Sequence, residues 1–175
     1  HLPDRYKNEI FTNVLITNNI KYGQALLYTG SGTEDLMLDL YQPEADTTSS
    51  RPLVIGVHGG AFISGDKQAA NWPEVCKAFA KRGYVAASIN YRLGRAAGEE
   101  YEPAWRAQQD LRAAIRFARA NAAAIKINSS KIYIMGSSAG GATCLITAYM
   151  DAGEAPASVN QAIWGNIEGS SGSPG

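Results

Sequence analysis

Residues 132–141 read IYIMGSSAGG, and this stretch decides the fold and the chemistry that the sequence predicts. The apolar run 132–135 is typical of a buried strand, and residues 143–149 continue with a helical pattern. Between them lies a G-x-S-x-G motif with Ser138 at its centre. A sharp turn from strand to helix strains the central serine and exposes its hydroxyl, and it requires small residues on either side. The motif predicts a nucleophilic serine, with a glycine- and serine-rich turn without chemistry as the alternative.

Two nucleotide-binding motifs compete for the same stretch. Gly136 and Gly141 have the spacing of a phosphate loop, but Ala142 stands where the lysine that reaches the phosphates would be. A dinucleotide-binding fingerprint needs a glycine where Ser138 stands. Nucleotide binding is therefore disfavoured.

A second small-residue motif, HGGAF at residues 58–62, follows the apolar run 53–57. Backbone N–H groups in such a turn, joined by that of the residue after the nucleophile, can point at the oxyanion that develops during attack on a carbonyl. The alternative is a plain turn at the end of a strand. We expect the side chain of His58 to organise this loop rather than to act as a catalytic base.

The order of elements predicts an α/β fold. The first forty residues alternate as two or three antiparallel strands do, and a polar loop at 45–52 follows them. Further strands are expected at 53–57, 85–89 and 132–135, and helices at 71–83, 103–122 and 138–149. Right-handed crossovers then give a mostly parallel sheet with helices on both faces and an antiparallel N-terminal meander.

Several side chains are expected to have only structural roles. Cys76 and Cys144 fall on helices on opposite faces of this sheet, so both are expected to be free, buried thiols. Asp66 and Lys67 are expected to form a solvated pair in the loop, with contact to the substrate as the alternative. The charged positions of the helix at 103–122 are expected to be ordinary surface: Arg106, Asp110, Arg112, Arg116 and Arg119.

Taken together, these motifs resemble a known family. HGGAF and GSSAGG, with NYRL at 90–93 and DLRAA at 110–114, are similar to the α/β-hydrolase fold. Within that fold the chain resembles the carboxylesterases and lipases that carry an HGG-type oxyanion loop. The resemblance covers about residues 10–165.

The resemblance also implies roles for single residues. It implies that Ser138 is the nucleophile and that His58 and Gly59 support the oxyanion loop. The backbone N–H groups that it implies for the oxyanion hole are those of Gly60, Ala61 and Ala139. Two positions depart from the family pattern without removing an N–H group: Ala61 replaces a third glycine, and Ser137 replaces an aspartate.

The family order of catalytic residues is Ser, then Asp or Glu, then His, and here it is incomplete. Only 37 residues follow Ser138 (175 − 138 = 37), and both histidines, His1 and His58, precede it. We therefore expect the base, the acid and the C-terminal strands to be missing from this chain, with a C-terminal fragment or a second chain supplying Asp and His. The expected organisation is a single α/β-hydrolase domain over 1–175, incomplete at its C-terminus, with 164–175 as an exposed Gly/Ser loop.

Composition limits the partners of the protein. Sixteen basic and sixteen acidic residues leave no net charge that would attract nucleic acid or an anionic membrane. No apolar run approaches the roughly 18 residues needed to span a bilayer. The two cysteines lack the spacing of a zinc site, and no metal or organic cofactor is expected.

These observations favour a carboxylic-ester hydrolase, a serine carboxylesterase or lipase that acts on a small-molecule ester through an acyl-enzyme intermediate. Two alternatives stay open. One is an amide hydrolase of the arylformamidase or peptidase type, and the other is a catalytically inactive α/β-hydrolase-like binding protein. Similarity to exported esterases favours a secreted or periplasmic location, with a cytoplasmic one as the alternative.

Overall fold

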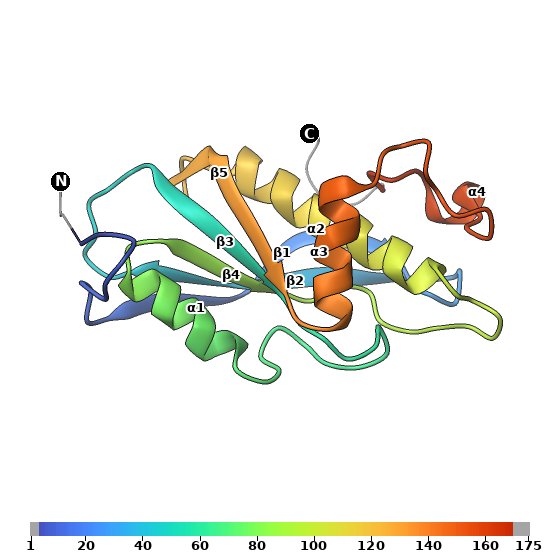
Figure 1. Cartoon of the computed structure of the whole chain (residues 1–175), viewed down its shortest axis with the longest axis horizontal. Coiled ribbons are helices and arrows are strands. Elements are labelled where there is room, and N and C mark those ends of the chain that lie inside the picture. The colour runs from blue at the N-terminus through green and yellow to red at the C-terminus, as the bar shows by residue number, and fades with distance from the viewer. Residues whose placement is uncertain (1–3, 170–175) are drawn as a thin grey trace.

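The computed structural model describes residues 4–169, which form one mixed five-stranded sheet with helices on both of its faces (Figure 1). The strands are β1 (Val14–Leu26), β2 (Thr33–Pro43), β3 (Arg51–Val57), β4 (Val85–Ile89) and β5 (Ile127–Gly136). The helices are α1 (Trp72–Lys81), α2 (Glu102–Ala120), α3 (Ala139–Tyr149) and the short α4 (Gln161–Trp164).

The strand order across the sheet is β1-β2-β4-β3-β5. β3 runs parallel to β4 and to β5, whereas β2 is antiparallel to both β1 and β4. β3 and β4 are buried at every position, as their continuous apolar sequences predict. The predicted α/β arrangement is thus confirmed in part, since the sheet is mixed rather than mostly parallel over the described residues.

The helices divide between the two faces of the sheet. α1 packs on β2 and β4 over a small cluster that contains Tyr41, Cys76 and Ala86. α2 packs on the opposite face over the main core, and α3 lies beside it against β5 (Figure 1). Ala86 faces the cluster under α1, and Ala87 faces the main core under α2. The two neighbours differ because successive side chains of a strand point to opposite faces of the sheet.

Both cysteines are free, as predicted, but only one is fully buried. Cys76 lies in the cluster under α1, whereas Cys144 is half-buried at the edge of the main core. Burial raises the pKa of the Cys76 thiol to about 12 and that of Cys144 to about 11. Both groups are therefore protonated and unreactive at neutral pH.

Several charged residues of α2 are not ordinary surface, contrary to the prediction, whereas Arg119 is exposed as predicted. Arg106 and Asp110 are fully buried. Asp110 forms an ion pair with Arg92, at 2.8 Å, and not with Arg106. Arg106 instead binds Glu99, also at 2.8 Å. These charges can be buried because each has a partner in the loop after β4.

The described part of the predicted C-terminal loop is only partly exposed. Trp164 and Ile167 are buried against α2, and the guanidinium of Arg106 lies 4.6 Å from the ring centroid of Trp164. The side-chain amide of Gln109 donates to the carbonyl oxygen of Trp164 at 2.8 Å. The prediction was wrong for Trp164 and Ile167, because side chains of α2 bind the backbone of this segment, whereas Asn166 and Glu168 are exposed as predicted. Residues 170–175 lie outside the described range.

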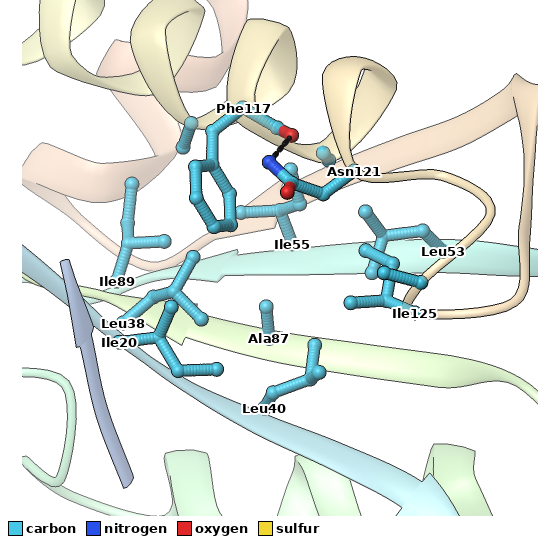
Figure 2. Close-up of a pocket in the computed structure, with 13 residues that line it drawn as sticks. Ile20, Leu38, Leu40, Leu53, Ile55, Ala87, Ile89, Phe117, Asn121 and Ile125 are labelled. Carbon is cyan, nitrogen blue, oxygen red and sulfur yellow. Dashed lines mark hydrogen bonds between the residues drawn. The ribbon is translucent and has the colours of Figure 1, made fainter. Parts of the chain in front are cut away.

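An apolar cavity of about 80 Å³ lies between the sheet and the C-terminal half of α2. Figure 2 shows Leu38, Leu40 and Ala87 of the sheet facing Phe117 of α2 across this space. The only side-chain amide in the lining, that of Asn121, donates to the carbonyl oxygen of Phe117 at 2.8 Å. The lining is therefore almost entirely apolar, with Asn121 as its one polar side chain.

Filling this cavity is expected to stabilise the protein. Ala87→Val adds two methyl groups to a strand position that faces the empty space, so the free energy of unfolding should rise by about 1 kcal/mol. Ala86→Val is the matched control, because Ala86 is the neighbour on the same strand and faces the filled cluster under α1. This control should lower the free energy of unfolding by overpacking. Urea denaturation measures both, and equal destabilisation by the two changes would contradict the prediction.

Candidate active site

Ser138 occupies the turn between β5 and α3 with φ 52° and ψ −121°. This left-handed φ is unfavourable for a residue with a side chain, because Cβ crowds the following carbonyl group, at a cost of about 1–2 kcal/mol. α3 begins at the next residue, Ala139, and Ser138 is exposed. The positive φ predicted from the motif is confirmed.

The glycines of the motif are needed because backbone from two elements meets at this turn. A Cβ on Gly136 would lie 2.3 Å from the carbonyl carbon of Gly140. A Cβ on Gly140 would lie 2.1 Å from the carbonyl oxygen of Val57, at the end of β3. The amide of Ser137 also donates to that oxygen, at 3.3 Å. The turn around Ser138 is thus held directly against the end of β3.

This contact brings the HGGAF loop beside the serine. A Cβ on Gly59 would lie 3.0 Å from the carbonyl oxygen of Ser137 and 3.2 Å from the Cβ of Ser138, so a side chain there would be crowded and the glycine favours this close approach. The next residues, Gly60, Ala61 and Phe62, all have positive φ, at 118°, 53° and 63°. Two of these three residues carry side chains, so the loop is strained and must be held by its surroundings.

Several backbone amides near this turn are without an acceptor, and three of them are the ones that the motifs single out. Within residues 4–169, the N–H groups of Gly60, Ala61 and Ala139 donate no hydrogen bond. Ala139 is the first residue of α3, so its N–H group has no partner within the helix and lies at the positive end of the helix dipole. Such amides can stabilise negative charge on an oxygen bound next to Ser138.

His58 is buried beneath the loop and does not bind Ser138. Its carbonyl oxygen accepts from the hydroxyl of Tyr91 at 2.9 Å, and the His58 ring stacks on the Tyr91 ring at 4.4 Å. Its Nδ1 lies 2.7 Å from the carbonyl oxygen of Gly59. Because a carbonyl only accepts, this nitrogen carries the proton. Burial lowers the pKa of the imidazole, so the ring is neutral at pH 7 and its Nε2 has no partner among the described residues.

The pair predicted at Asp66 and Lys67 does not form. Lys67 is buried and makes an ion pair with Asp39 of β2 at 3.2 Å, while Asp66 is exposed. The alternation of β2 marked Asp39 as an outward-facing strand position, and no local pattern indicated that the loop after β3 covers it. Sequence reasoning therefore missed both members of this pair.

The described residues contain no group of three or more His, Cys, Asp or Glu side chains arranged to hold a metal ion. Within the same range, no helix is both long and apolar enough to cross a membrane.

A family model named BD-FAE matches residues 38–168, which is most of the chain and includes both motifs. The chain belongs to the BD-FAE family. BD-FAE is an α/β-hydrolase-type domain, so the resemblance predicted from the two motifs is confirmed.

Relatives of this BD-FAE domain include named esterases and hydrolases. Human carboxylesterase 3 is 34% identical over 117 residues, which is 63% of this chain and 20% of the relative. Phenmedipham hydrolase from Pseudarthrobacter oxydans is 35% identical over 109 residues, 60% of this chain and 21% of the relative. The chain thus spans about a fifth of the length of these relatives.

Solved structures similar to the BD-FAE domain include esterase 2 from Thermogutta terrifontis. Its apo form has a TM-score of 0.60 and 30% identity, covering 78% of this chain and 49% of the esterase. The form phosphoramylated by tabun has a TM-score of 0.62 and 28% identity, covering 91% of this chain and 55% of the esterase. The described fold is therefore that of about half of such an esterase.

Proposed function

We propose that this BD-FAE domain carries the nucleophile and the oxyanion hole of a carboxylic-ester hydrolase. The observation that carries the proposal is the strained, exposed Ser138 next to Gly59, with unpaired backbone amides at Ala139 in its own turn and at Gly60 and Ala61 in the neighbouring loop. The esterase names of its relatives support the same substrate class.

The proposed reaction begins with attack of the Ser138 Oγ on the ester carbonyl carbon. A base takes the hydroxyl proton, and the N–H groups of Gly60, Ala61 and Ala139 bind the resulting oxyanion. Collapse of the tetrahedral intermediate breaks the bond to the alcohol oxygen, which leaves with a proton. Water then attacks the acyl-enzyme, and release of the acid regenerates the serine.

His58 is a poor candidate for the base in this reaction. Its protonated Nδ1 is bound to Gly59, its ring is held by Tyr91, and no hydrogen bond connects it to Ser138. We propose that His58 and Gly59 support the oxyanion loop. In this proposal the base and its carboxylate partner come from outside residues 4–169, from a C-terminal fragment or a second chain.

A panel of p-nitrophenyl esters and the matching p-nitroanilides tests this function on the protein as its gene encodes it. Ester turnover without measurable anilide turnover is the expected result, because p-nitrophenolate leaves without protonation, whereas the anilide nitrogen must be protonated by a positioned acid before it leaves. Turnover of the anilides would favour the amide-hydrolase alternative. Absence of turnover with tight binding of an ester analogue would favour the inactive binding protein.

A further inference from the structure

Lys67 is the first fully buried residue after His58 along the loop that carries the HGGAF motif. Residues between them are half-buried or exposed, and Lys67 marks where the loop returns to the sheet. Its Nζ lies 3.2 Å from Oδ1 of Asp39, and the two side chains are 9% and 0% exposed. A lysine so close to an exposed loop is rarely buried without a specific partner.

The surroundings of this ion pair connect the loop to three parts of the sheet. Asp39 also accepts from the side-chain amide of Gln68, at 3.1 Å, and from the backbone amide of Asn19 in β1, at 2.8 Å. The amide of Lys67 donates to Oδ1 of Asn90 at 2.7 Å, and its carbonyl accepts from the hydroxyl of Ser88 at 2.6 Å. The main chain and the side chain of Lys67 are thus held at the same time.

Stability alone does not explain such a pair, because burying two charges costs desolvation energy that their attraction offsets only with good geometry. The pair does explain how the loop keeps its shape. The positive φ angles of Ala61 and Phe62 are unfavourable, so the loop would relax if one of its ends were released. One end is held at His58 by Tyr91, and the middle is held where the Gly94 amide donates to the carbonyl of Phe62 at 2.9 Å.

We propose that Lys67 is a positioning residue, which through its ion pair with Asp39 keeps the amides of Gly60 and Ala61 directed at the oxyanion formed on Ser138. This inference rests on the proposed ester hydrolysis. Lys67 does not touch the substrate. It acts through the conformation of the loop.

The test compares Lys67→Met, Asp39→Asn and their double variant with wild type in the protein as its gene encodes it. Because loss of one oxyanion donor costs about 10²- to 10³-fold, displacement of the loop should lower kcat about 10- to 100-fold. KM should change less than about threefold, since substrate binds before the oxyanion forms. Affinity for a boronic acid that mimics the tetrahedral intermediate should fall by the same factor as kcat/KM.

Two further variants separate positioning from a merely structural role. Lys67→Arg keeps the charge and should restore a large part of kcat. The exposed pair of Lys21 and Asp35, at 2.5 Å with side chains 47% and 41% exposed, provides the matched control, and Lys21→Met should leave kcat unchanged. The double variant should lose no more than either single variant, because both changes break the same interaction.

Unchanged kcat and unchanged boronic acid affinity in folded Lys67→Met would overturn the inference. If that variant does not fold, Lys67→Gln is used under the same criteria. Hydrogen exchange at the amides of Ile63, Ser64 and Gly94, which donate to carbonyl groups of the loop, is the readout that does not depend on esterase activity, and it should become faster in the variants. If the wild type hydrolyses no ester but exchange is faster in the variants, the proposed function is refuted, while the anchoring of the loop by Lys67 stands. If exchange is unchanged in the variants, the anchoring itself is refuted.

Discussion

Replacing Ser138 by alanine is expected to lower kcat/KM for a p-nitrophenyl ester by about 10⁴-fold or more in the protein as its gene encodes it. The substitution removes the only atom that the mechanism allows to bond to the acyl carbon, while the unpaired amides of the turn stay in place. The small activity that remains should come from oxyanion stabilisation and substrate binding alone. Initial rates measure the loss, and labelling by a fluorophosphonate, followed by intact mass, should also disappear.

Ser137→Ala is the matched control for this prediction. Ser137 is the adjacent residue and is also exposed, but it lacks the positive φ of Ser138. It should keep activity within a few-fold of wild type and should still accept one fluorophosphonate. Full activity in Ser138→Ala, or loss of labelling only in Ser137→Ala, would show that the nucleophile was misassigned.

Residues 1–175 expressed alone are expected to show no Ser138-dependent ester turnover. A serine hydroxyl is a weak nucleophile at neutral pH unless a base lies within hydrogen-bonding reach. The one histidine within residues 4–169 is His58, whose ring is buried and held by Tyr91, and His1 lies outside the described residues. Hydrolysis of p-nitrophenyl acetate by wild-type 1–175 and by its Ser138→Ala variant should therefore be indistinguishable.

Turnover by 1–175 that is lost in Ser138→Ala would contradict this prediction, because a base within the chain or from a neighbouring copy would then complete the site. The dependence of specific activity on protein concentration separates these two sources. Within the described residues β5 is an edge strand, because it pairs only with β3, and its Tyr133 is 55% exposed. An unpaired edge strand of this kind favours association of copies. Specific activity that rises with concentration would identify a neighbouring copy as the source.

Local sequence patterns were sufficient to predict the main strands and helices and the turn at Ser138. Continuous apolar runs identified β3 and β4, and a strand followed by G-x-S-x-G predicted the positive φ that the structure has. These predictions succeeded because the forces concerned act between residues close in sequence. A Cβ on Gly136 would clash with Gly140, four residues on in the same tight turn. Gly140 is different, because the backbone that excludes a side chain there belongs to Val57 and His58 at the end of β3.

Charged residues were where prediction from sequence failed. Arg106, Asp110 and Lys67 were all expected at the surface, because a charge is normally exposed and its burial requires a partner. Their partners lie in other elements: Asp39 of β2 for Lys67, and Arg92 after β4 for Asp110. Nothing in a local pattern reveals such a partner.

The sequence by itself thus specified the α/β class, the strained serine turn and the glycine-rich loop after β3, since each depends on backbone sterics and hydrophobic periodicity within a short segment. The two motifs also led us to expect that this loop lies beside the serine turn and that His58 organises it. Tertiary structure alone decided that Lys67 is buried beside Asp39, Asp110 beside Arg92, and Arg106 beside Glu99. Those arrangements depend on which distant side chains share a buried environment, where a charge is tolerated only beside its counter-charge.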